Sequence, residues 1–108
     1  MSSVDILSVM NGSTRPRWTF LTTHAQVLTC IARDPSIRLR ELGEWIGITE
    51  RAAHRIVVEL TNEGYLIRER SGRRNSYTIN THFPLPDRVA LGQNVGALLA
   101  LLATGQEA

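Results

Sequence analysis

The chain has 108 residues and a formal net charge of +2, and 43% of its residues are hydrophobic. A chain of this length builds one modest core, and this hydrophobic content excludes bulk disorder. All 12 basic residues are arginine, whose planar guanidinium pairs well with phosphate oxygens and with guanine. The composition is therefore compatible with a nucleic-acid partner but does not identify one.

The sequence contains no feature typical of secretion or of membrane insertion. Its single cysteine, Cys30, excludes an intramolecular disulfide. Residues 4–10 are too short for a signal peptide and include an acidic residue. The most apolar run, residues 97–103, is far shorter than the roughly 18–20 residues that a membrane span requires. We therefore expect a cytoplasmic protein with no membrane partner.

Three regions follow one another along the chain. Residues 1–17 are rich in small polar residues and predict a loose N-terminal arm, with a helical turn near Ile6. Trp18 and Phe20 are expected to begin the packed domain, which extends over residues 18–80. Residues 81–108 predict a linker followed by a C-terminal helix.

The first predicted helix begins after Thr22, which is a good N-cap, and ends before Pro35. Its apolar positions, which share one helix face, are Val27, Leu28 and Ile31. A short extended segment at Ile37 then leads to the next helix.

Two further helices are predicted at residues 39–46 and 50–62. Gly47 ends the first of them, because glycine readily adopts positive φ after a helix. Thr49 caps the second. Gly43 leaves room for the close approach of the two helices. This order predicts a helix-turn-helix, in which the second helix enters the major groove of DNA.

Residues 65–70 and 75–80 are β-prone runs separated by the sequence SGRR, which predicts a hairpin. A basic hairpin directly after a helix-turn-helix is a wing, and its arginines suit phosphates or the minor groove. The predicted fold is therefore mainly α with a small β-hairpin (α+β), a winged helix-turn-helix with a flanking arm and a C-terminal helix.

The face of helix 50–62 opposite its apolar side carries Arg51 and Arg55, four residues apart. The predicted DNA-binding residues are Thr49, Glu50, Arg51, Ala52, His54 and Arg55 on this helix, and Arg70, Arg73, Arg74 and Asn75 on the wing. In the alternative, Arg51 and Arg55 form only a solvated face, paired with Glu50 and Glu59.

Residues 22–80 resemble the winged helix-turn-helix transcriptional regulators of bacteria and archaea, of the MarR-like or ArsR-like type. The strongest motif is GITERAAHRIVVELTNEGYL, with its L-x-x-E-G-Y-L passage from helix to wing. The resemblance implies a DNA-binding repressor or activator, usually a homodimer. It implies DNA contact for residues 49–55 and for Arg73 and Arg74, and it implies no effector.

The sequence departs from both groups of regulators in its candidate ligand sites. Cys30 stands alone on the apolar side of its helix and is expected in the core. His24, His54 and His82 lie on three elements without the spacing of metal ligands. We therefore expect no metal, no cofactor and no enzymatic activity. There is room for only one terminal helix on each side, which argues against a dedicated ligand pocket, and any small-molecule effector stays unknown.

The last predicted helix, residues 87–103 with Asp87 at its start, is apolar nearly all round. A partner subunit would cover such a helix, so we predict a homodimer. The predicted interface residues are Val95, Leu98, Leu99 and Leu102. In the alternative, this helix folds back onto the first helix of its own chain.

Trp45 occupies a position in the helix-turn-helix that is usually polar. It is expected to pack under the N-terminal arm or Trp18, or else to lie in a subunit contact.

Two functions agree with these patterns. The first is a dimeric transcriptional regulator that binds double-stranded DNA. The second is a winged-helix module that binds protein and not DNA, because a fold alone does not specify the ligand.

Overall fold

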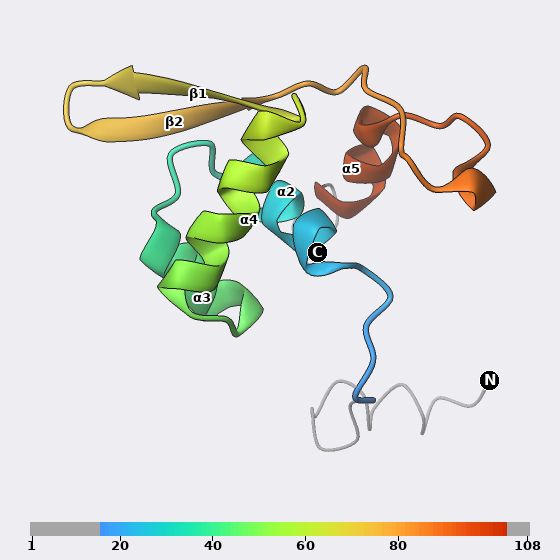
Figure 1. Cartoon of the computed structure of the whole chain (residues 1–108), viewed down its shortest axis with the longest axis horizontal. Helices are drawn as coiled ribbons and strands as arrows, with labels where there is room; N and C mark the ends of the chain where they lie inside the picture. Colours follow the sequence, from blue (N-terminus) through green and yellow to red (C-terminus); the bar gives the residue numbers. More distant parts are fainter. Residues whose placement is uncertain (1–15, 104–108) are drawn as a thin grey trace.

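The computed structural model describes residues 16–103, which form helices on one side of a single hairpin (Figure 1). The helices are α2 (Thr23–Arg33), α3 (Leu39–Ile46), α4 (Glu50–Asn62) and α5 (Val95–Ala103), with a 3-10 turn η1 (Arg88–Ala90). The antiparallel strands are β1 (Leu66–Ser71) and β2 (Arg74–Ile79). The predicted α+β winged helix-turn-helix is confirmed. The arm at residues 1–15, with the turn near Ile6, and residues 104–108 lie outside the described part.

Helix α2 begins and ends where its capping residues predict. The hydroxyl oxygen of Thr22 accepts a hydrogen bond from the backbone N–H of Ala25 at 3.1 Å. A turn occupies Pro35 and Ser36, and the short segment that follows at Ile37 leads into α3 with Arg38 in extended backbone angles, but it forms no strand. The backbone N–H of Tyr77 donates to the carbonyl oxygen of Pro35 at 2.9 Å, so one hydrogen bond joins the turn to β2.

A tight turn joins α3 to α4. Gly47 takes φ 88° and ends α3 in the left-handed region, as predicted. The N–H groups of Gly47 and Ile48 both donate to the carbonyl oxygen of Gly43, at 2.7 and 3.0 Å. A Cβ atom on Gly43 would lie 2.6 Å from the carbonyl oxygen of Ile48. Glycine is therefore required at position 43 because two backbone segments meet there.

The hairpin turns more tightly than the sequence pattern suggested. Ser71 pairs with Arg74, so only Gly72 and Arg73 form the turn. Gly72 has φ 65°, a conformation that favours glycine. Arg73 therefore lies at the tip, while Arg74 belongs to β2 instead of the predicted loop.

The predicted helix 87–103 begins eight residues later than expected. Asp87 precedes only η1, and Leu91 then adopts φ 52°, which ends the helical path. Two hydrogen bonds fold the connector back on itself, from the N–H of Leu85 to the carbonyl of Gln93 at 2.8 Å and from Val95 to Phe83 at 2.9 Å. Asn94 then caps α5, since its side-chain oxygen accepts from the N–H of Ala97 at 2.9 Å.

One core joins the helices α2, α3, α4 and α5 and the hairpin. Its buried residues are Val27, Leu28, Ile31, Ile37, Leu42, Ala53, Ile56, Val57, Leu60, Leu66, Tyr77, Val95 and Leu99. Val95 and Leu99 are 1% and 5% exposed, because α5 packs against α2 of the same chain. Their assignment to a subunit interface is corrected accordingly. The core also continues past the domain boundary predicted at residue 80.

The two aromatic residues before α2 do not enter this core. Trp18 is 60% exposed and Phe20 is 90% exposed. Their rings contact each other edge to face, with centroids 4.9 Å apart. The expectation that they begin the packed domain is therefore wrong, since the described core starts within α2.

Candidate nucleic-acid interface

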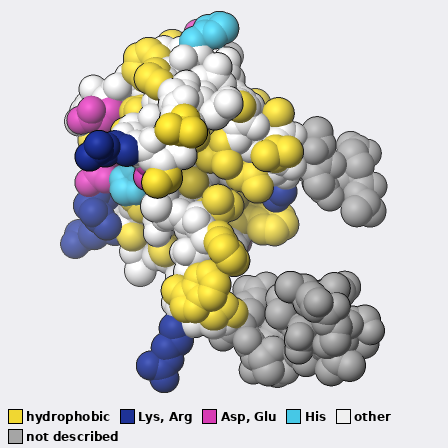
Figure 2. All heavy atoms as spheres, turned by 90° about the vertical axis from the view of Figure 1, so that its right-hand side faces the viewer, with side chains coloured by type: hydrophobic (Ala, Val, Ile, Leu, Met, Phe, Trp, Pro, Cys, Tyr) yellow, Lys and Arg dark blue, Asp and Glu magenta, His cyan; other side chains and the backbone are white. Residues whose placement is uncertain are grey.

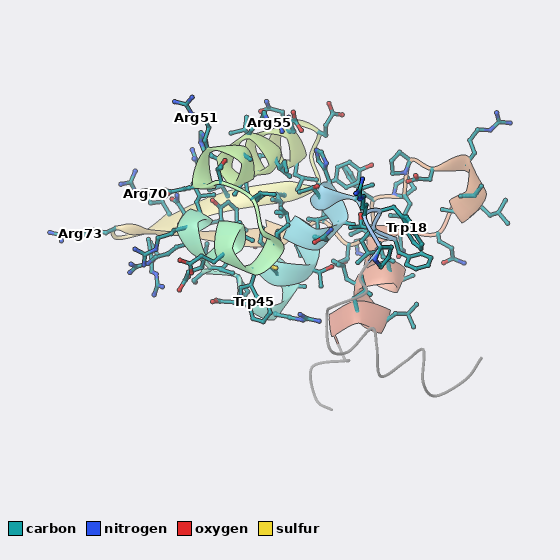
Figure 3. All side chains as sticks on the ribbon, turned by 90° about the horizontal axis from the view of Figure 1, so that it is seen from below. Trp18, Trp45, Arg51, Arg55, Arg70 and Arg73 are labelled. Atoms are coloured by element: carbon teal, nitrogen blue, oxygen red, sulfur yellow. The ribbon has the colours of Figure 1, made fainter. Side chains whose placement is uncertain are left out.

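Helix α4 buries one face and leaves the opposite face to solvent. Ile56 and Val57 are buried against the core, whereas Arg51, His54 and Arg55 are exposed. Figure 3 shows Arg51 and Arg55 pointing away from the body of the molecule on the same side. The separation of the two faces follows from the helical period of the apolar positions.

The start of α4 is capped by Thr49, whose hydroxyl oxygen accepts from the N–H of Ala52 at 3.0 Å. Thr49 and Glu50 are exposed and Ala52 is half-buried. Helix N-termini attract anions, because the first N–H groups lack helical partners and the helix dipole is positive there. The carboxylate of Glu50 opposes this attraction at the same place.

Arg55 is not independent of its surroundings. Its Nη1 lies 3.6 Å from Oε2 of Glu59, one helical turn later. The other carboxylate oxygen of Glu59 lies 2.7 Å from Nε2 of His24 on α2. The alternative interpretation of a paired arginine thus holds in part for Arg55, whereas Arg51 has no salt bridge within the described residues.

The predicted wing residues Arg70, Arg73, Arg74 and Asn75 are all exposed. In Figure 3, Arg70 and Arg73 extend from the hairpin at the end of the molecule that also carries Arg51. The side chain of Arg70 donates from Nε to the carbonyl oxygen of Gly72 at 3.4 Å, across the turn. The structure therefore gathers arginines from α4 and from the wing at one edge.

A hollow of about 760 Å³ separates the start of α3 from the hairpin. Four arginines line it, together with the acidic Glu50: Arg38, Arg40, Arg73 and Arg74. Arg38 and Arg40 were not among the DNA-binding residues predicted from the sequence. The sequence pattern R-L-R could have indicated them, because Leu39 packs against the core and both neighbours are exposed.

A second large hollow, the apolar groove, lies between α2, the end of α4, the connector 81–94 and α5. Its volume is about 850 Å³. Its apolar lining includes Phe20, Leu28, Leu60, Tyr65, Leu85, Val89, Leu98 and Leu99. The sequence analysis predicted no dedicated pocket, because only one terminal helix is available on each side. In the structure, the folded connector 81–94 forms one side of the groove.

The remaining candidate ligand residues are dispersed. Cys30 is half-buried and packs against the core, and its burial raises the pKa of the thiol despite the opposing charge of Arg33. Among residues 16–103, no three His, Cys, Asp or Glu side chains form a group that could hold a metal ion. No helix in the same range is long and apolar enough to cross a membrane.

Neither a known protein-family model nor a curated protein matches the chain. Solved structures do match it. One is a MarR family protein of Mycobacterium tuberculosis, Rv2887, in complex with salicylic acid, with 16% sequence identity and a TM-score of 0.50. That match covers 81% of this chain and 61% of the other, so the chain spans less than two thirds of the length of Rv2887.

A second match is the zinc-dependent MarR family transcriptional regulator AdcR in its Zn(II)-bound state, with 15% identity and a TM-score of 0.46. It covers 97% of this chain and 80% of the other. The match to Rv2887 establishes the fold, a winged helix-turn-helix of the type found in MarR family proteins. The likeness concerns the fold and not the ligand.

Proposed function

We propose that this protein is a transcriptional regulator that binds double-stranded DNA in a sequence-specific manner. One observation carries the proposal: Arg51 on the exposed face of α4 and Arg70 and Arg73 on the wing extend at one edge of the molecule (Figure 3). Two basic elements at one edge can contact the groove and the flanking phosphates of the same duplex.

Helix α4 is the recognition helix of this proposal. An α-helix is about 10–12 Å wide and fits the major groove, which is about 12 Å wide. Arg51 and Arg55 would contact guanine edges, since the guanidinium matches the two acceptors of guanine. Thr49, Ala52 and His54 are close enough in the helix to contact neighbouring bases or phosphates. The carboxylate of Glu50 would repel phosphates, so only binding geometries that keep the DNA backbone away from it would be stable.

The wing would contact the DNA backbone beside the recognition helix. Arg73 at the tip would contact a phosphate at the edge of the minor groove, where the potential is most negative. The hollow lined by Arg38, Arg40 and Arg74 would accept a phosphate between α3 and the hairpin. Asn75, at the rim of the same hollow, would add a neutral hydrogen bond.

The protein is proposed to act as a homodimer through the surface around α5. Since Val95 and Leu99 are buried within the chain, the second copy would instead cover exposed apolar side chains near this helix. Phe20, Val89 and Leu91 are 90%, 90% and 89% exposed. Figure 2 shows hydrophobic side chains gathered on the face that carries α5 and the connector. Leu98 and Leu102 are half-buried and would form its border.

A two-fold dimer suits DNA recognition because it places two recognition helices on successive turns of one face of the duplex. The half-sites would then be inverted repeats about one helical turn apart. When the two subunits bind both half-sites at once, the affinity of the dimer exceeds that of one subunit, which compensates for the low net charge of each chain.

Selection from a pool of random duplex DNA, repeated at two salt concentrations, tests the proposal. The expected result is an enriched inverted repeat that is lost in the Arg51→Ala, Arg55→Ala double variant. Arg88→Ala is the matched control, because Arg88 is an exposed arginine in η1, at the opposite end of the molecule from the wing (Figure 1). Absence of enrichment at both salt concentrations would contradict DNA recognition and favour the protein-binding module.

A further inference from the structure

A third hollow, hereafter the Trp45 hollow, lies between the end of α2 and the outer side of α3. Its volume is about 670 Å³. Cys30 and Ile37 form an apolar part of its lining, and both pack in or against the core. The rest of the lining is Arg33, Asp34, Glu41, Glu44 and Trp45.

Trp45 is the most unusual residue of this hollow. Its side chain is 72% exposed, although an indole of this size buries a large apolar area when it finds a partner. Figure 3 shows Trp18 and Trp45 well apart, so the expected packing of Trp45 against Trp18 is wrong. Residues 1–15 of the N-terminal arm, the other expected partner, lie outside the described residues. Trp is also among the residues that contribute most to binding energy at protein interfaces.

The charges around Trp45 are mainly negative. Glu41 and Glu44 lie three residues apart on α3, and Trp45 is four residues from Glu41, so the three share one side of the helix. One oxygen of Glu41 accepts from the N–H of Arg38, whereas Glu44 has no hydrogen bond or ion pair within the described residues. Arg33 offsets only one of the three carboxylates that line the hollow, those of Asp34, Glu41 and Glu44, so the lining is net negative. Nη2 of Arg33 also donates to the carbonyl oxygen of Leu102 at 3.0 Å.

The Trp45 hollow faces away from the proposed DNA-binding edge. In Figure 3, Trp45 lies on the side of the molecule opposite to Arg51 and Arg55, with α2 and α3 between them. Its acidic rim would repel a phosphate backbone, so this face is unsuited to DNA. An occupant of this hollow and a duplex bound to α4 would not compete for space.

We propose that the Trp45 hollow docks a segment of another protein that carries an arginine or lysine next to an aliphatic residue. The cation would lie over the indole face of Trp45 and pair with Glu44. The aliphatic side chain would enter the hollow and contact Cys30 and Ile37. An extended segment suits the site better than a small cation, because the hollow is open and only a longer occupant would remove Trp45 from water.

The test uses a displayed library of random peptides, selected on the full-length protein. The enriched peptides are expected to combine a basic with an aliphatic residue. A synthetic peptide of the enriched sequence should bind Trp45→Ala at least about tenfold more weakly than wild type. Glu44→Gln should weaken binding less, by a factor that shrinks as the salt concentration rises from about 0.1 M to about 1 M. Both residues are exposed, so neither change should affect folding.

Tryptophan fluorescence locates the bound peptide. The chain has two tryptophans, so Trp18→Phe leaves Trp45 as the only indole. Its emission should shift to shorter wavelength when the enriched peptide binds. Trp45→Phe, which retains Trp18, is the matched control and should show no shift.

Several results would overturn the proposal. They are absence of enrichment, enrichment of acidic or purely apolar peptides, and equal peptide affinity of wild type and Trp45→Ala. A change of oligomeric state on Trp45→Ala, without peptide binding, would assign the hollow to a second copy of the chain instead. These outcomes are independent of DNA binding, which is measured separately on the same variants and should not change.

Discussion

The imidazole of His24 and the carboxylate of Glu59 are joined by a hydrogen bond of 2.7 Å, which links α2 to α4. The second oxygen of Glu59 lies 3.6 Å from Nη1 of Arg55. The carboxylate of Glu59 therefore contacts both His24 on α2 and Arg55 on the proposed DNA-binding face. Both side chains of the His24–Glu59 pair are almost half exposed, so the contribution of the pair to stability is small, at most about 1 kcal/mol.

Glu59→Gln is expected to raise the affinity for DNA. The amide can still accept a hydrogen bond from His24, but it no longer attracts Arg55 or repels phosphates. We expect a several-fold increase at low salt, for specific and random duplexes alike, measured by fluorescence anisotropy. Glu63→Gln, at the end of the same helix, changes the net charge equally and is the control. An equal increase in both variants would exclude a role of the Glu59 position itself.

The wing is expected to supply affinity without sequence preference. Arg73→Ala combined with Arg74→Ala should weaken binding to all duplexes similarly, because both residues are proposed to contact phosphates. The proposed dimer loses two contacts in each subunit, so the slope of log K against log salt should fall by roughly 3–4, since each phosphate contact contributes about 0.9. Titrations at several salt concentrations measure it, with Arg88→Ala as the control. A loss confined to one sequence would instead indicate base contacts by the wing.

The proposed dimer surface can be tested without disturbing the core. Phe20→Asp combined with Val89→Asp should give a monomer in sedimentation experiments, with an unchanged urea midpoint at low protein concentration. Both positions are 90% exposed in the single chain, so a charge there costs little until a second copy covers it. Ile67→Asp on the hairpin is the control. A double variant that is still dimeric would place the interface elsewhere.

Deletion of residues 87–108 is not a suitable version of this experiment. It would remove Val95 and Leu99, which are buried in the core of the same chain. Loss of a large core side chain lowers the free energy of unfolding by about 2–5 kcal/mol. The truncated chain would therefore lose stability as well as any interface.

The turn between α3 and α4 is expected to tolerate no side chain at position 43. Gly43→Ala should lower the free energy of unfolding by about 1–3 kcal/mol, because the new Cβ meets a backbone oxygen at 2.6 Å. In an open helix the same change would stabilise by about 1 kcal/mol. Urea denaturation distinguishes the two signs. Gly47→Asn is the control, since no atom lies near its Cβ and asparagine tolerates positive φ.

Cys30 is expected to react slowly with alkylating reagents. Burial raises the pKa of its thiol, so less thiolate is present at about pH 8 than in the unfolded chain. Because the folded state holds the proton more tightly, stability should decrease as the pH rises past the usual thiol pKa. The alkylation rate with and without urea measures the difference. A pH series separates the effect of the thiol pKa from that of limited access to the reagent. If the alkylation rate rises over the same pH range with and without urea, the pKa of Cys30 is not raised in the folded state.

The sequence by itself determined the three helices α2, α3 and α4, the presence of the hairpin and the exposed face of α4. Thr22, Thr49 and Gly47 act on neighbouring backbone groups, so their capping roles need no knowledge of the fold. The positions of Arg51 and Arg55 opposite the buried face of α4 follow from the helical period alone. These features are local, and the structure agrees with them.

The tertiary structure decided what depends on residues far apart in the chain. The start of α5 at Val95 follows from hydrogen bonds of the connector with itself, and the burial of Leu99 follows from contact with α2. The arginine-lined hollow forms where the start of α3 faces the hairpin, two segments that are distant in the sequence. Trp45 is exposed, and the ring of Trp18 contacts Phe20. Periodicity identifies an apolar face, but only packing shows which surface covers it.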